Sequence, residues 1–69
     1  MNATEVERLV RDVIVHGGLP FTVLSVSSSA TGWTIVVRSE TGEIVQFPLA
    51  DGRPVDMRIT IQDTLEGQS

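Results

Sequence analysis

The apolar residues of this chain change their spacing once, near residue 20, and that change most constrains the fold. From Val6 to Ile14 they recur three and four positions apart, as on one stripe of an amphipathic helix. After Pro20 they occur in β-branched or alternating runs that are typical of strands. A chain that passes once from helix to strands in this way is expected to belong to the α+β class.

We expect the helix to cover about residues 3 to 16. Two capping boxes compete for its start, Thr4 with Glu7 and Asn2 with Glu5, because in each pair the side chains can bond to free backbone N–H groups. The glycine pair at 17 and 18 can supply the left-handed conformation that ends many helices.

Three strands are expected next, over residues 21–27, 33–38 and 44–49, and the loops between them are short enough for antiparallel pairing. Gly42 is placed for a positive-φ turn position. Pro48 indicates a strand end or a sheet edge, because proline has no N–H to donate.

The segment from 54 to 65 fits two structures. Val55, Met57, Ile59 and Ile61 alternate with polar residues, as in a fourth strand. Pro54 instead suits the first turn of a helix, and the length exceeds that of an average strand. We favour the helix, which gives the order α-β-β-β-α in one domain over residues 1–69, with residues 66–69 as a frayed tail.

The chain is acidic, with nine Asp and Glu residues against five arginines and no lysine, a composition typical of a GC-rich bacterial genome. Such a charge balance argues against non-specific nucleic-acid binding, which depends on cations that neutralise phosphates. Neither a secretory signal nor a membrane span is visible, so we expect a cytoplasmic protein.

No catalytic, cofactor or metal site is expected. The chain has no cysteine and a single histidine, His16, which falls in the last turn of the predicted helix, where a cation is stabilised by the helix dipole. The serine run at 27–29 lacks the glycines of a nucleophile elbow. We therefore predict that the protein is not an enzyme and needs no cofactor.

A sheet covered by helices on one face leaves the other face open, and both faces of the first two strands carry apolar residues. We expect this surface to bind a partner protein or a second copy of the chain. Trp and Arg dominate binding hot spots. The candidate interaction surface is Trp33, Ile35, Val37, Arg38, Arg53 and Arg58.

Two further arginines are spaced for ion pairs along the helix, Glu7 with Arg11 and Arg8 with Asp12. Arg38, Arg53 and Arg58 have no such partner four residues away. They could converge on an anion, which leaves nucleic-acid binding as the alternative function.

The order of elements resembles the double-stranded-RNA-binding layout, which small toxins of the HicA type also use. That resemblance implies an RNA-binding helix start and, in the toxins, a catalytic histidine in the sheet. Here His16 lies outside the expected strands, and Pro54, Val55 and Asp56 stand where a basic helix start is expected. The resemblance therefore extends to the layout and not to these residues.

Overall fold

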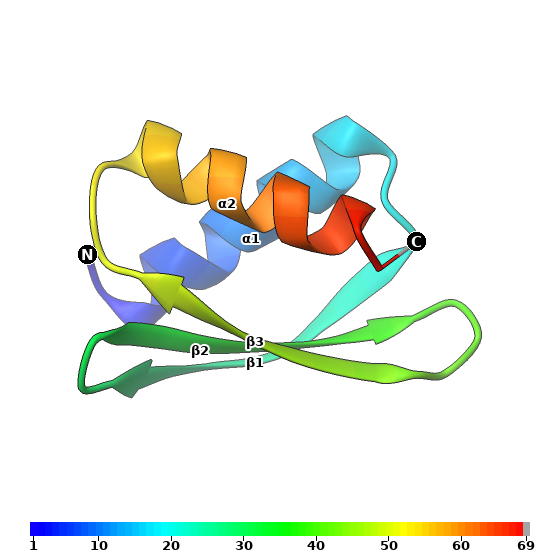
Figure 1. Ribbon diagram of the computed structural model, residues 1–69, viewed down its shortest axis with the longest axis horizontal. Helices are drawn as coiled ribbons and strands as arrows, with labels where there is room; N and C mark the ends of the chain where they lie inside the picture. The colour runs from blue at the N-terminus through cyan, green and yellow to red at the C-terminus, as the bar shows by residue number, and fades with distance from the viewer. Residues whose placement is uncertain (69) are drawn as a thin grey trace.

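The computed structural model describes residues 1–68 (Figure 1). Its elements are α1 (Ala3–Gly17), β1 (Phe21–Ser29), β2 (Gly32–Ser39), β3 (Ile44–Ala50) and α2 (Pro54–Glu66). The predicted α-β-β-β-α order is confirmed.

Helix α1 begins after a residue whose side chain bonds to a free backbone N–H of the first turn. The side-chain Oδ1 of Asn2 accepts a hydrogen bond from the backbone N–H of Glu5 at 2.9 Å, so Asn2 is the N-cap and not Thr4. At the other end Gly18 adopts the left-handed conformation with φ 61°, and its N–H bonds to the carbonyl oxygen of Val15. The predicted stripe is confirmed: Val6, Leu9, Val10, Val13 and Ile14 are all buried.

The three strands form an antiparallel sheet in the order β1-β2-β3. Between β2 and β3 the register is regular, whereas β1 contains a bulge between Val23 and Ser25. Val23 lies opposite Val37, and Ser25 lies opposite Val36, so Leu24 is one residue more than β2 can pair. Pro48 lies in β3, an edge strand, which confirms the expectation from its missing N–H.

The segment after residue 53 is a helix, so the fourth-strand alternative is wrong. Met57, Ile61 and Leu65 are buried four residues apart, and Pro54 occupies the first turn. Val55 and Ile59 are more than half exposed, which is why the apolar pattern of this segment also resembles a strand. Glu66 is the last residue of α2, and the N–H groups of Gly67 and Gln68 each bond to a helix carbonyl oxygen at 3.1 Å. Ser69 lies outside the described residues.

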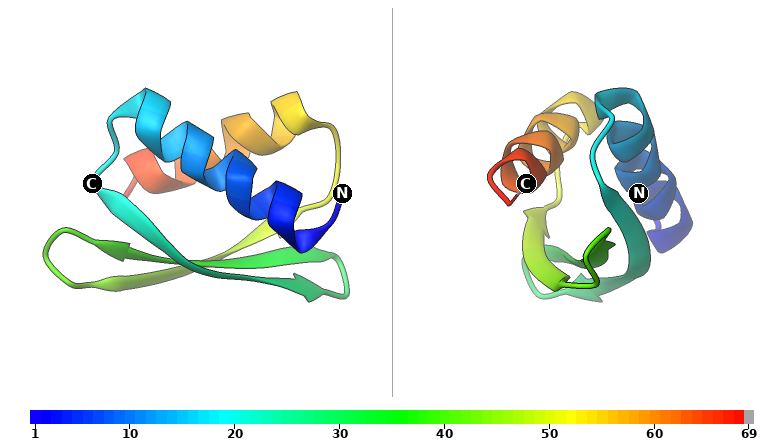
Figure 2. Two further views of the ribbon diagram at one scale, coloured as in Figure 1. Left: turned by 180° about the vertical axis from the view of Figure 1, so that it is seen from behind. Right: turned by 90° about the vertical axis from the view of Figure 1, so that its right-hand side faces the viewer.

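Both helices lie on one face of the sheet and run in the same direction, and no helix or strand of residues 1–68 covers the other face (Figures 1 and 2). The core between the layers combines residues of both helices with Phe21 of β1, Ile35 and Val37 of β2, and Phe47 and Leu49 of β3. Within residues 1–68 no helix has the length and apolar character needed to cross a membrane.

Candidate protein-interaction surface

The three apolar residues predicted for the interaction surface lie on the covered side of the sheet. Ile35 and Val37 have no accessible surface and belong to the core, and Trp33 is partly buried against that core. Their placement on an uncovered face was therefore wrong. Alternation along β2 points Trp33, Ile35 and Val37 to one side, and the helices cover that side.

Trp33 has one unusual feature. Its indole Nε1 is buried and has no hydrogen-bond acceptor among the described residues. A buried donor without an acceptor lowers stability, because the group has lost its bond to water and gained nothing in exchange. The tryptophan therefore contributes to the core through its ring and not through its N–H.

The three candidate arginines do not converge. Arg38 lies in β2 opposite Thr22 and Ile44, at the end of the sheet where β3 starts, whereas Arg53 follows the end of β3. The Nε of Arg53 bonds to Oδ2 of Asp56 at 3.0 Å. The guanidinium of Arg58 lies 3.5 Å from Oδ2 of Asp12 in α1.

One of the two ion pairs predicted within α1 is present. Glu7 and Arg11 form an ion pair with the charged atoms 3.7 Å apart. Asp12 pairs with Arg58 of the other helix, a residue 46 positions away, and not with Arg8. Both pairs are exposed, so each adds at most about 1 kcal/mol to stability.

The uncovered side of the sheet contains three cross-strand rows in which every strand contributes a side chain; a fourth row, Ser29–Gly32–Ala50, has glycine at its centre. From β1 through β2 to β3 the first three rows are Thr22–Arg38–Ile44, Ser25–Val36–Gln46 and Ser27–Thr34–Pro48. We call these nine residues the open face. Its side chains alternate with those of the core. Both helices lie on the opposite side of the sheet (Figure 2).

The open face differs from the rest of the molecule in charge. It contains no carboxylate, although the chain has nine, and its only charged residue is Arg38. Arg38 makes no ion pair or side-chain hydrogen bond with the described residues. Val36 is half-buried at the centre of the face, and Ile44 of β3 is 60% exposed at one end. Leu24, in the bulge of β1 on the far side of β2, is 47% exposed.

Strand alternation alone would have placed Ile44 on this face, since it lies next to Val45, whose side chain points to the core. For Val26 strand alternation gives the wrong side. Counting from Val23, it predicts that Val26 lies on the open face, but Val26 packs against the core because the bulge inserts one residue between them. No feature of the sequence predicts this bulge.

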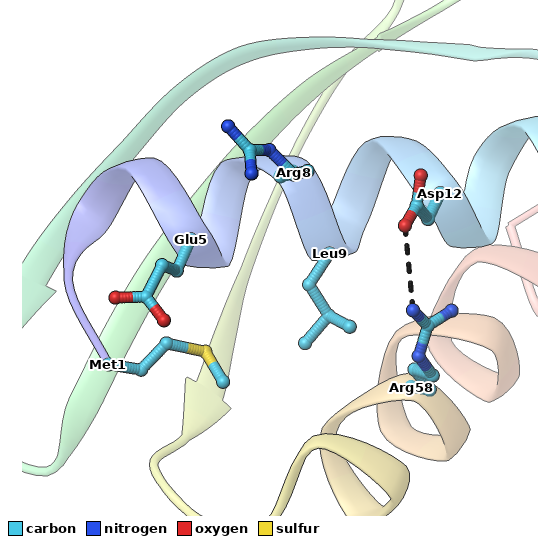
Figure 3. A pocket seen from close by; sticks show the side chains of 6 residues that line it. All are labelled: Met1, Glu5, Arg8, Leu9, Asp12 and Arg58. Carbon is cyan, nitrogen blue, oxygen red and sulfur yellow. Dashed lines mark hydrogen bonds and ion pairs between the residues drawn. The ribbon is translucent and has the colours of Figure 1, made fainter.

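Two hollows lie elsewhere on the surface. The first, of about 220 Å³, opens between the helices and is lined by Met1, Glu5, Arg8, Leu9, Asp12 and Arg58 (Figure 3). The charges of its two arginines and two carboxylates compensate each other, so it attracts neither anions nor cations strongly. The second, of about 270 Å³, lies beside the β2–β3 turn and includes Glu40 and Glu43.

His16 is exposed in the last turn of α1 and bonds to no described side chain. Among residues 1–68 no group of three or more His, Cys, Asp or Glu side chains lies close enough to hold a metal ion. We found no protein family, curated protein or solved structure that matches the chain.

Proposed function

We propose that this protein is a non-catalytic interaction module that binds a partner protein through the open face of its sheet. The observation that carries the proposal is the charge distribution: the face has no carboxylate in a chain of net charge −4. Charged residues are depleted at the centre of protein interfaces, because their desolvation opposes binding.

The chemistry of the open face suits a non-obligate complex. Serine, threonine and glutamine side chains surround Val36, so the surface is mixed polar and apolar and stays soluble when no partner is bound. An obligate interface of this kind would be more apolar throughout. We therefore expect a partner that binds and dissociates.

Arg38 defines the charge that the partner needs. It is the only charge on the face and has no acid partner in the described chain. A carboxylate on the partner at this position would form a charge-assisted hydrogen bond with the guanidinium. The partner's surface is thus apolar opposite Val36 and acidic opposite Arg38.

Nucleic-acid binding has less support from the arrangement of the arginines. Phosphate affinity grows with the number of cations that contact the backbone together. Arg53 and Arg58 are bonded to Asp56 and Asp12 in the helical layer, while Arg38 lies on the open face. The three do not form one basic surface.

The experiment compares proteins captured from cell extract, before and after nuclease treatment, by the tagged wild type and two variants. Ile44→Glu places a carboxylate on the open face, and Ile59→Glu makes the same change on α2. The two isoleucines are matched, at 60% and 55% exposure. We expect a protein that wild type and Ile59→Glu retain after nuclease and that Ile44→Glu loses.

Arg38→Glu provides the second test, because it reverses the charge that a partner's carboxylate would meet. The same protein should be lost from this variant. Capture that is identical for all variants would contradict the proposal, since the bound surface would then lie elsewhere. Loss of all captured material on nuclease treatment would support nucleic-acid binding instead.

A further inference from the structure

The two edges of the sheet are protected to different degrees. Exposed strand edges present unpaired N–H and C=O groups, and proteins commonly protect them with proline or with charged side chains. β3 carries Pro48 in its interior. β1 has nine residues, Phe21–Ser29, and none of them is proline or charged. Its bulge near Leu24 is the only irregularity, and it leaves the last part of the strand regular.

Two hydrogen bonds show which backbone groups point outward. Glu40 donates to the carbonyl oxygen of Pro20 at 3.1 Å, and Ser39 donates to that of Glu43 at 2.8 Å. The backbone N–H and C=O groups of even-numbered residues of β2 therefore point to β1, and those of odd-numbered residues point to β3, because bonding alternates along an antiparallel strand. Opposite them, Ser27 bonds toward β2, whereas the backbone groups of Val26 and Ser28 point to the free edge.

The same alternation directs the nitrogen of Pro48 to the outer edge of β3, since its partner Thr34 is an even-numbered residue that bonds toward β1. The β3 edge thus lacks one donor where a neighbouring strand would need it. The β1 edge lacks none between Val26 and Ser28.

We propose that two copies of the chain pair antiparallel through the Val26–Ser28 edges of β1 and form one continuous six-stranded sheet. With the two-fold axis at Ser27, Val26 of each copy lies opposite Ser28 of the other. This arrangement forms about four backbone hydrogen bonds between the copies. It is isologous, so the same residues serve both sides, and β1 brings no charges together.

Pairing also enlarges the open face, an advantage that rests on the proposed function of that face. Three strands about 4.8 Å apart and about 23 Å long cover roughly 350 Å². The six-stranded sheet presents a continuous face of twice that flat area, so it can contact more of a partner's surface than one open face can.

The test uses the purified protein alone, so its result is independent of any partner. Sedimentation measured up to about 1 mM protein should show a mass rising from 7.5 kDa toward twice that value, because an interface this small gives a weak dimer. Amide hydrogen exchange of Val26 and Ser28 should slow as concentration rises, while that of Ser27 stays unchanged. A mass that remains at 7.5 kDa at 1 mM would overturn the proposal.

Two matched variants separate this edge from the other surfaces. Ser28→Lys adds a charge to the β1 edge, and Gln46→Lys adds the same charge to β3 and the open face. We expect at least tenfold weaker association for Ser28→Lys and none of this loss for Gln46→Lys. Ser28→Pro removes an outward N–H and should have the same effect as Ser28→Lys, provided that circular dichroism shows it folded.

Equal loss in Ser28→Lys and Gln46→Lys, or loss only in Gln46→Lys, would place the contact on the open face and overturn the edge pairing. Failure of dimerisation leaves the capture experiment unaffected, because that experiment depends on Ile44 and Arg38. The two proposals can therefore fail separately.

Discussion

Gly32 is the glycine at which substitution by alanine should lower the free energy of unfolding most. It begins β2 opposite Ala50, with φ +150°, a conformation that side chains rarely adopt. A Cβ at this position would lie 2.4 Å from the carbonyl oxygen of Leu49 and 2.7 Å from the backbone nitrogen of Asp51. Both atoms are backbone, so the end of β3 itself has to move in Gly32→Ala.

Two other glycines separate the causes. At Gly42 φ is +91° and a Cβ would meet nothing within 4 Å, so Gly42→Ala carries the backbone strain without the clash. At Gly52 a Cβ also meets nothing and φ is not positive. We expect a change within about 0.5 kcal/mol for Gly52→Ala and a loss of about 1–2 kcal/mol for Gly42→Ala.

For Gly32→Ala the strain of about 1–3 kcal/mol combines with the displacement of β3, and we expect a total loss of about 3–5 kcal/mol. A domain of 69 residues has a free energy of unfolding of about 3–10 kcal/mol. The loss is therefore about a third or more of the total free energy of unfolding. Urea unfolding followed by circular dichroism measures all three variants. A loss for Gly32→Ala no larger than that for Gly42→Ala would refute the reasoning.

Five further changes test other parts of the structure by the same unfolding measurement. Asn2→Ala removes the side chain that caps α1 and should cost about 1 kcal/mol. Asp12→Ala and Arg58→Ala should each cost less than about 1 kcal/mol, since their ion pair is exposed; a larger loss would show that it orients the helices. Trp33→Phe should cost less than about 1.5 kcal/mol, because the lost ring area is offset by removal of a buried N–H without an acceptor. Deletion of Leu24 should leave a folded protein, since the remaining residues keep their partners in β2; an unfolded product would show that the bulge is required.

Helix α1 and the three strands could be predicted from sequence because their signals are local. The apolar stripe of α1, the capping residue Asn2 and the prolines at 20 and 48 each act within a few residues. Helix α2 was harder to predict, since exposed Val55 and Ile59 give the segment the alternation of a strand. Its buried residues become distinguishable only once α1 and the sheet provide the surface on which they pack.

Only one of the ion pairs, Glu7 with Arg11, was predicted from the sequence. Local spacing predicted that Arg8 would pair with Asp12, but the packing of the two helices brings Arg58 to that carboxylate instead. Likewise Arg53 and Arg58 had no acid four residues away, yet each finds one, Arg53 three residues along and Arg58 on the other helix. The Arg58–Asp12 pair depends on how the two helices pack, which a one-dimensional pattern does not contain, whereas the Arg53–Asp56 pair is local and its three-residue spacing was overlooked.

The bulge in β1 changes which residues of that strand face outward. Trp33, Ile35 and Val37 were misplaced for a different reason: the sequence does not show which face of β2 the helices cover. In a regular strand every second residue faces the same side, so Val26 would join Leu24 on the face opposite Val23. Because Leu24 is an extra residue, Val26 turns back to the core and Ser25 and Ser27 take the open side. One inserted residue thus moves an aliphatic side chain inward and leaves serines outside, which makes the open face mostly polar. It also sets where regular pairing can resume along the free edge, at Val26, and so limits any neighbouring strand to the end of β1.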